Sequence, residues 1–279
     1  MTSIGVVTDS TADLQPAVQE RLGVAVVPLI INWDGQTYRD RIDLTHADFY
    51  RRLRTSKSLP RTGSPSLVAF ETAFREQLKQ HDTVVSVNLA ARLSGTYEVA
   101  RRAAESVDPQ RIAVVDSGSV SVCLGWLAET AADLARQGAA LAEIVERLEE
   151  VRGRVRILAL LETLEFLQRG GRIGRAAALA GTLLSVKPIL TVKDGEVAPV
   201  ERVRTMNGAL RRLVELVVAQ GPVERLGVID ADAATNAAEV EKQLRQRYPD
   251  LTVERGKLGP VVGTHGGPGV VGVGILLAR

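Results

Sequence analysis

The sequence is short of cysteine, aromatic residues and net charge, and each shortage excludes a class of protein. Cys123 has no second cysteine to pair with, so a disulfide within the chain is impossible, which favours a reducing cytoplasm. Aromatic residues make up 4% of the chain, too few for the stacking platform that binds single-stranded nucleic acid. The net charge of +2 gives no strong attraction to nucleic acid or to an anionic membrane. We therefore expect a cytoplasmic protein that has no nucleic-acid partner.

Long apolar runs are missing as well. A helix that crosses a bilayer needs about 20 apolar residues. The run from Gly269 to Ala278 is too short for that and is typical of a buried strand. The first residues lack the basic stretch followed by an apolar stretch that marks a signal peptide. We expect no signal peptide and no stable insertion into a membrane.

The sequence also has no recognisable motif for a metal, a nucleotide or a covalent catalyst. Its three histidines and one cysteine do not have the spacing of zinc ligands. The glycine-rich segment 170–174 lacks the Gly-Lys-Ser/Thr ending of a P-loop, so a structural turn is the better interpretation. Asp9 and Asp116 each follow a predicted strand, where they form an acid–base pair or a metal-binding pair, or act as caps, and caps are the commoner case. We expect no metal, no cofactor and no catalytic residue.

What the sequence does contain is a regular alternation of strand and helix patterns. Its 279 residues, 45% of them hydrophobic, suffice for two α/β domains. From residue 4 to residue 152, short β-branched runs alternate with amphipathic helices, which predicts a parallel sheet flanked by helices. Residues 188–200 then form a predicted hairpin around Asp194-Gly195, which indicates an α+β domain with a mixed sheet. We place the two domains at residues 1–155 and 156–279.

Two polar loops precede predicted helices and combine hydroxyl groups with free backbone N–H groups. They are Thr62-Gly63-Ser64-Pro65-Ser66 and Leu93-Ser94-Gly95-Thr96-Tyr97. A helix start carries partial positive charge, and nearby hydroxyls add short hydrogen bonds, so each loop is suited to binding an anion. Helix capping by serine and threonine is the simpler interpretation of each loop taken alone.

A third loop, residues 263–269, holds His265 among glycine and proline residues. We expect His265 on exposed, tightly turned backbone, where it donates to a carboxylate, acts as an acid or base, binds a metal, or caps a turn. Arg202 and Arg204 follow the predicted hairpin and share one face of a strand, so either one can reach an anionic ligand. Ion pairing with the neighbouring glutamates is the alternative for both arginines.

These loops resemble those of the DegV family, and the matching segments follow one another along nearly the whole chain. The opening Val7-Thr8-Asp9-Ser10-Thr11-Ala12-Asp13-Leu14 resembles the start of the family's sequences. The match is close in the segments Leu93-Ser94-Gly95-Thr96-Tyr97, Gly170-Gly171-Arg172-Ile173, Lys187-Pro188-Ile189-Leu190 and His265-Gly266-Gly267-Pro268-Gly269. The loop at 62–66 departs from the family's Thr-Ser-Gln-Pro-Ser at Gly63 and Ser64.

The resemblance implies a DegV-like fold of two domains with a long-chain fatty acid, such as palmitate or oleate, between them. The family's carboxylate-binding hydroxyls correspond to Thr62 and Ser94, its C-terminal histidine to His265, and its arginine after the hairpin to Arg204. Further loop contacts are implied at Gly63, Ser64, Gly95 and Arg202.

The resemblance also implies a carrier rather than an enzyme. Its partner would be a fatty acid kinase subunit, which binds ATP and phosphorylates the carboxylate while the carrier holds it. Two alternatives stay open. One is an enzyme similar to dihydroxyacetone kinase, in which His265 acts on a small carbonyl substrate. The other is a lipid-sensing regulatory protein.

Overall fold

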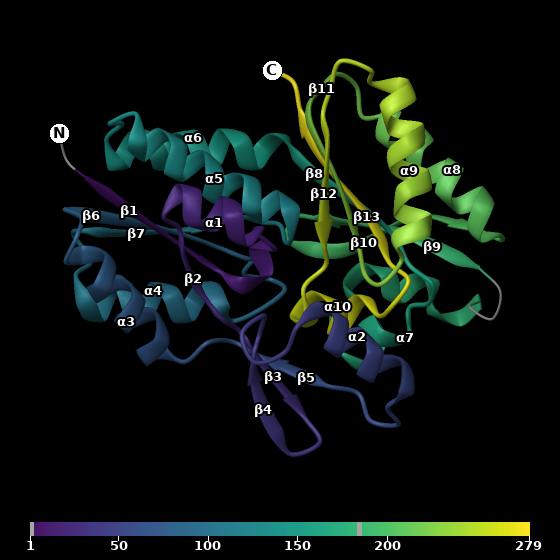
Figure 1. The fold of residues 1–279 in the computed structure, drawn as a ribbon, viewed down its shortest axis with the longest axis horizontal. Helices are drawn as coiled ribbons and strands as arrows, with labels where there is room; N and C mark the ends of the chain where they lie inside the picture. Colours follow the sequence, from purple (N-terminus) through teal and green to yellow (C-terminus); the bar gives the residue numbers. More distant parts are fainter. Residues whose placement is uncertain (1–2, 183–185) are drawn as a thin grey trace.

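The computed structural model describes residues 3–182 and 186–279. Figure 1 shows two large sheets side by side, each covered by helices, with a small third sheet below them. The sheets have four, six and three strands. The predicted α/β fold, a parallel sheet flanked by helices followed by a mixed-sheet domain, is confirmed.

The four-stranded sheet is parallel throughout, with the order β2-β1-β6-β7. Its strands are β1 (Ile4–Asp9), β2 (Ala25–Val27), β6 (Thr83–Asn88) and β7 (Ile112–Asp116). A 3-10 turn (Ser10–Ala12) and α1 (Pro16–Leu22) follow β1. One face is covered by α3 (Leu67–Leu78) and α4 (Thr96–Val107), and the other by α5 (Val122–Arg136) and α6 (Leu141–Arg154). Because helices cover both faces, the strands are apolar on both sides.

The small antiparallel sheet has the order β4-β3-β5, with β3 (Ile30–Trp33), β4 (Gln36–Arg39) and β5 (Arg61–Gly63). The helix α2 (His46–Thr55) lies between β4 and β5 in the chain. The apolar residues 24–31 contribute to two strands in different sheets, because Pro28 has no N–H group with which to continue the ladder. The first two residues of the predicted loop at 62–66 belong to β5, in which Thr62 pairs with Ile31.

The six-stranded sheet is mixed, with the order β10-β9-β8-β13-β11-β12. Its strands are β8 (Val155–Leu160), β9 (Lys187–Lys193), β10 (Glu196–Val203), β11 (Val223–Asp230), β12 (Val253–Lys257) and β13 (Val271–Leu277). The antiparallel pair β9–β10 confirms the hairpin predicted around Asp194-Gly195. Two helices, α8 (Met206–Val218) and α9 (Ala234–Arg247), cover the outer face of this sheet. The division of the chain at residue 155 stays an interpretation.

The inner face of the six-stranded sheet is turned toward α5, so the two large sheets share one core. A Cβ atom at Gly274 would lie 2.4 Å from Cγ1 of Val122, so the glycine is what allows α5 to approach β13 this closely. Three short elements complete the C-terminal part: α7 (Glu165–Arg169), a 3-10 segment (Gly174–Thr182) and α10 (Pro260–Gly266).

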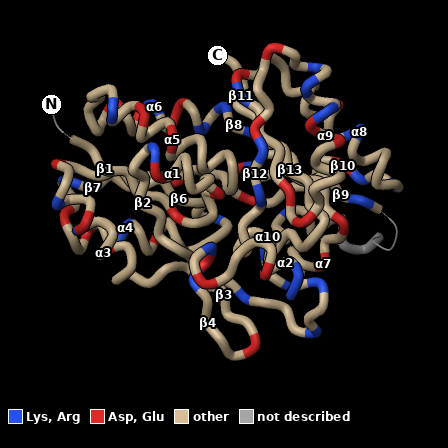
Figure 2. Tube along the Cα trace, in the orientation of Figure 1, with Lys and Arg blue, Asp and Glu red and all other residues tan. Residues whose placement is uncertain are grey.

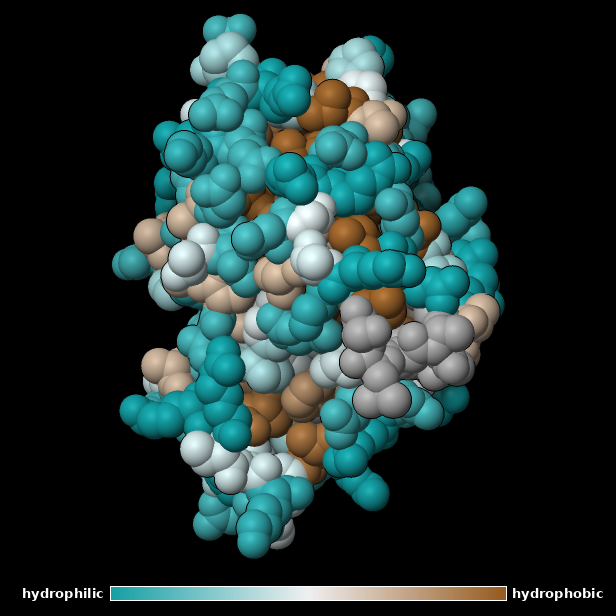
Figure 3. Space-filling model, turned by 90° about the vertical axis from the view of Figure 1, so that its right-hand side faces the viewer, coloured by the Kyte–Doolittle hydropathy of each residue, from teal (hydrophilic) through white to brown (hydrophobic). Residues whose placement is uncertain are grey.

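Acidic and basic residues are mixed along the outer helices, as expected from the small net charge (Figure 2). On the face seen in Figure 3, hydrophobic residues show as separate patches between hydrophilic ones. None of the helices in residues 3–182 and 186–279 combines the length and the apolar character needed to span a bilayer.

Candidate functional site

An apolar cavity lies where the two large sheets meet. Its volume is about 140 Å³ when counted as room for the centres of water molecules, roughly ten times what a single water requires. Thr11, Leu89 and Val120, which follow the carboxyl ends of β1, β6 and β7, line one side. In open parallel sheets this edge is the usual place for a ligand.

The opposite wall of the cavity is apolar because side chains alternate along β8. Ile157 and Ala159 line the cavity, whereas Leu158 and Leu160 pack on the other face of the sheet in the core beneath α8 and α9. The alternation of side chains along β8 therefore places half of these apolar residues in the core and half in the wall of the cavity.

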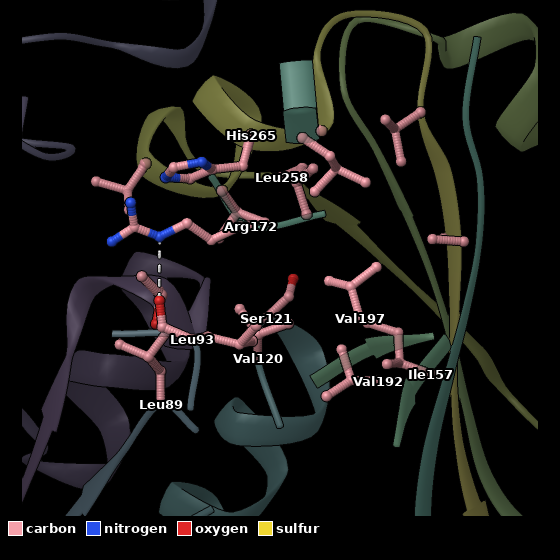
Figure 4. Close-up of a pocket in the computed structure, with 18 of the residues that line it drawn as sticks. Leu89, Leu93, Val120, Ser121, Ile157, Arg172, Val192, Val197, Leu258 and His265 are labelled. Carbon is pink, nitrogen blue, oxygen red and sulfur yellow. Dashed lines mark hydrogen bonds between the residues drawn. The ribbon is translucent and has the colours of Figure 1, made fainter. Parts of the chain in front are cut away.

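The two ends of the cavity differ in polarity. Figure 4 shows His265 and Arg172 near one end, and Val192, Val197 and Ile157 of the six-stranded sheet toward the other. Few polar side chains interrupt the apolar lining away from the His265 end. Such a cavity suits a ligand with a long apolar part and one polar group.

Thr62 and His265 meet at the polar end of the cavity. Oγ1 of Thr62 lies 2.8 Å from Nε2 of His265, although 203 residues separate them in sequence. Thr62 is on β5 of the small sheet, and His265 is in the last turn of α10. The structure thus brings together two of the residues that the sequence predicted for one site.

Ser94 lies at the same end, in a short chain of hydroxyl groups. Oγ of Ser94 is 3.3 Å from Oγ of Ser64 and 2.9 Å from Oγ1 of Thr96. It also accepts a hydrogen bond from the N–H group of Thr96, at 3.3 Å, where α4 begins. The N-cap position itself is Gly95, and the Ser94 hydroxyl before it satisfies a free N–H group of the first helical turn while also lining the cavity. The two interpretations of this loop are therefore compatible.

His265 is not on exposed loop backbone as the sequence suggested. It is half-buried in α10, which packs so closely on Gly170 that a Cβ atom there would lie 2.3 Å from Nδ1 of the imidazole. Burial, and after it the positive charge of Arg172, lower the pKa of His265 to about 4. The ring is therefore neutral at pH 7. Among the described residues, its Nδ1 has no hydrogen-bond partner.

Arg172 is a cavity residue that the sequence analysis did not select. Its Nε donates to the carbonyl oxygen of Leu93 at 3.2 Å, drawn in Figure 4, and its Nη1 donates to that of Gly170 at 2.9 Å. These carbonyls fix the guanidinium group while leaving its charge uncompensated by any carboxylate in the described residues. The available signal was its place inside the glycine-rich segment 170–174, as the only charged side chain there.

The structure does not bring the two arginines after the hairpin to the cavity. Arg204 follows the end of β10 and is exposed, and neither it nor the exposed Arg202 is among the cavity-lining residues. Gly63 and Gly95 lie within the loops that carry Thr62 and Ser94. A Cβ atom at Gly95 would be 3.5 Å from Oγ of Ser64.

Asp9 and Asp116 act as caps that hold the Ser94 loop. Asp9 is fully buried, which raises its pKa, and it accepts from the N–H group of Leu89 at 2.8 Å. Asp116 accepts from the N–H groups of Ala91 at 3.1 Å and Gly118 at 2.8 Å. Both carboxylates are thus occupied in fixing backbone, which favours the cap interpretation over an acid–base pair.

A metal centre was not expected from the sequence. Within the part of the chain that the structure describes, no three histidine, cysteine, aspartate or glutamate side chains are grouped so as to hold a metal ion.

Residues 3–278 match the family model described as "Uncharacterised protein, DegV family". A DegV domain-containing protein of Caldanaerobacter subterraneus is 36% identical over 276 residues, which cover 98% of each chain.

Two solved structures have the same fold over the whole chain. One, described as fatty acid binding of a DegV family protein from Thermus thermophilus, has a TM-score of 0.93 at 33% identity and covers 99% of this chain and 100% of its own. The other is DegV from Bacillus subtilis, described as a fatty acid binding protein. It has a TM-score of 0.90 at 33% identity and covers 100% of both chains.

Proposed function

Because the chain belongs to the DegV family, we propose that it binds one long-chain fatty acid in its cavity and presents the carboxylate to a partner fatty acid kinase. The observation that carries this proposal is the polarity of the cavity. Its lining is mainly apolar, and the imidazole of His265, the guanidinium group of Arg172 and the hydroxyls of Thr62 and Ser94 gather at one end. The other polar side chains of the lining are the hydroxyls of Thr11, Ser121 and Thr191. A fatty acid has the same division between a long apolar chain and one charged end. We further propose that the protein works in the cytoplasm.

The acyl chain supplies most of the binding energy. Burying a chain of about 15 methylene groups at about 0.8 kcal/mol each gives roughly 12 kcal/mol before the costs of association. Side chains such as Ile157, Val192 and Leu190 provide the apolar surface for this contact. A ligand held in this way dissociates slowly, which suits transfer to a partner protein better than free diffusion.

The carboxylate needs hydrogen bonds and a compensating charge, since a buried carboxylate without them is costly. In the neutral tautomer that carries its proton on Nε2, His265 donates to Oγ1 of Thr62, which frees the threonine hydroxyl hydrogen for a carboxylate oxygen. This is the tautomer that the proposal requires. The hydroxyl of Ser94 supplies a second donor, and the guanidinium group of Arg172 offsets the negative charge. No catalytic residue of this chain takes part in this arrangement.

The kinase reaction would use the carboxylate as nucleophile. One carboxylate oxygen attacks the γ-phosphorus of ATP on the kinase, a new O–P bond forms, and the P–O bond to ADP breaks, giving an acyl phosphate and ADP. No proton transfer is needed, because the carboxylate is already ionised. The role of this chain is to hold the carboxylate in one position, where ATP bound to the partner kinase can reach it.

Two other functions were open from the sequence. An enzyme similar to dihydroxyacetone kinase would bind a small polar substrate at His265, whereas the cavity beside this histidine is mainly apolar and suits a long acyl chain better. A lipid-sensing regulatory protein would use the same cavity and would differ in having no kinase partner.

The proposal is tested in two steps with protein freed of co-purified lipid. Palmitate and oleate should each bind one per chain and raise the melting temperature, and loaded protein should then make a fatty acid kinase release ADP from ATP. Binding without kinase turnover would leave a lipid-sensing protein as the better account. If neither palmitate nor oleate bound, both the fatty-acid-binding role and the kinase-partner role would be wrong.

A further inference from the structure

A second hollow, the vestibule, lies directly outside the polar end of the acyl cavity. It has a volume of about 410 Å³, counted in the same way as the cavity. It shares Thr62, Arg172 and His265 with the cavity. Its other walls are Leu59, Pro60, Arg61, Phe166, Arg169, Gly170 and Thr264. A group attached to the ligand's carboxylate would therefore enter the vestibule.

The vestibule is lined by three arginines and by no carboxylate. Arg61, Arg169 and Arg172 all line it. Arg169 shares its charge with the exposed Glu165, 2.9 Å away, whereas Arg61 and Arg172 have no acidic partner among the described residues. This local excess of positive charge contrasts with the mixed charges on the rest of the molecule (Figure 2). One carboxylate carries a single negative charge and does not require three arginines. The vestibule therefore has more positive charge than a free fatty acid needs.

The frame of the vestibule is fixed in position. Arg172 is held by the carbonyl oxygens of Leu93 and Gly170, as described above. Phe166 packs so tightly on Gly267 that a Cβ atom there would lie 2.3 Å from Cδ2 of the ring. Arg61 lies next to Thr62 on β5, and the side chains of Arg61 and Arg169 are both exposed. The inner part of the vestibule is therefore fixed, and two mobile arginines at its open side can close on a charged group of the ligand.

We propose that the vestibule is a phosphoryl subsite, in which Arg61 and Arg169 hold the phosphate of an acyl phosphate more tightly than the carboxylate site holds the free acid. A phosphoryl group carries up to two negative charges and three terminal oxygens, which guanidinium groups match with paired hydrogen bonds. The inference rests on the proposed function, since the acyl phosphate is the product of the partner kinase. Its consequence is that the product stays on the carrier after the kinase leaves.

The test compares two ligands on the full chain after removal of bound lipid. One is palmitate. The other is the β-ketophosphonate analogue of palmitoyl phosphate, in which a methylene group replaces the bridging oxygen. The wild-type protein should bind the analogue about tenfold more tightly than palmitate. The double variant Arg61→Ala/Arg169→Ala should lose about tenfold or more for the analogue and stay within about twofold for palmitate.

Two further variants control for charge and for folding. Arg61→Lys/Arg169→Lys should recover part of the analogue affinity, because it restores charge without the paired donors. Arg136→Ala removes an exposed arginine at the end of α5, 3.9 Å from Asp133, and should match the wild type with both ligands. Inorganic phosphate should compete with the analogue and leave palmitate bound.

The proposal is overturned if the double alanine variant binds the analogue like the wild type, or loses both ligands equally. Displacement of palmitate by inorganic phosphate would also overturn it, because the two subsites would then be one. If the wild type bound the analogue in an arginine-dependent way but did not bind palmitate, the fatty acid proposal would fail and the phosphoryl subsite would stand.

Discussion

At the scale of single residues, the polar end of the cavity depends on hydroxyl groups. A hydroxyl can be removed without changing the size of the side chain, so its contribution to binding can be tested by itself. The change Thr62→Val keeps the shape of the side chain and removes the hydroxyl that lies 2.8 Å from His265. Loss of one hydrogen bond to a charged group costs about 1.5–3 kcal/mol, so palmitate affinity should fall by roughly ten- to a hundredfold. Isothermal titration calorimetry on lipid-free protein measures this directly.

Thr191→Val is the matched control for this prediction. Thr191 also lines the cavity, and its hydroxyl makes a long 3.4 Å contact with the carbonyl oxygen of Val192. Its loss should leave palmitate affinity unchanged or slightly improved. Equal losses in both variants would mean that the carboxylate is not bound at Thr62.

Of the residues predicted for the site, three lie together in the structure, and their role in binding a carboxylate stays a prediction. Thr62, Ser94 and His265 were selected for one site, and the structure brings them to one end of one cavity. Arg172 was missed because a long side chain can reach a site from a turn that looks merely structural. The role of Arg204 stays a prediction, since its exposed position after an edge strand lies outside the cavity lining.

At the scale of elements, the site depends on how closely α10 packs on the end of α7. Gly170→Ala is compatible with the backbone there, which is right-handed with φ of −76°, but its Cβ would lie 2.3 Å from Nδ1 of His265. The imidazole must move, so its bond to Thr62 should break and palmitate affinity should fall by about tenfold while the protein stays folded. Calorimetry and circular dichroism check the two halves of this expectation.

Gly153→Ala separates the steric effect from the general effect of replacing glycine. Gly153 lies in α6, and a Cβ atom added there would have no other atom within 4 Å. Alanine should therefore raise helix stability by up to about 1 kcal/mol and leave binding alone. If Gly170→Ala also left palmitate binding unchanged, His265 would not be positioned by the close packing of α10 on Gly170.

The elements that the sequence failed to predict are those decided by tertiary contacts. Residues 260–266 have the glycine and proline content of a loop, yet they form α10. A Cβ atom at Gly263 would lie 2.2 Å from the hydroxyl oxygen of Tyr50, so this glycine serves close packing on α2 rather than a turn. The parallel strands and the hairpin were predictable because their patterns are local: β-branched runs, and an Asp-Gly turn.

At the scale of the whole molecule, two carboxyl groups with little access to solvent lie near the contact between the N-terminal and C-terminal parts, and one of them, Asp13, bonds across it. Asp13 accepts from the N–H group of Gly259 at 2.9 Å, just before α10, and also from the hydroxyl of Ser121. Asp40 accepts from the hydroxyl of Ser10 at 2.7 Å. Burial raises the pKa of Asp13 to about 6 and that of Asp40 to about 7.

These raised pKa values predict how stability depends on pH. The folded chain binds both protons more tightly than the unfolded chain, so their contribution to the free energy of unfolding is present below about pH 4 and is lost as pH rises toward 7. Asp40→Asn cannot ionise. Relative to the wild type, it should therefore gain on the order of 2 kcal/mol of unfolding free energy between pH 5 and pH 8 in urea titrations.

Asp43→Asn is the control for pH. Its side chain is on the surface beside Arg39, which lowers the pKa of the carboxyl to about 2, so it is ionised throughout this range. Its stability relative to the wild type should not change between pH 5 and pH 8. If the stability of Asp40→Asn relative to the wild type also stayed constant between pH 5 and pH 8, Asp40 would not be protonated in the folded protein.

Whether the cavity between the two large sheets holds a fatty acid can be read from the protein as purified, by native mass spectrometry followed by lipid extraction. We expect one long-chain fatty acid per chain, and its loss in Ala159→Phe, where the larger side chain would occupy part of the cavity. Wild-type protein that carries no lipid, and that is not stabilised by added palmitate or oleate, would contradict this expectation.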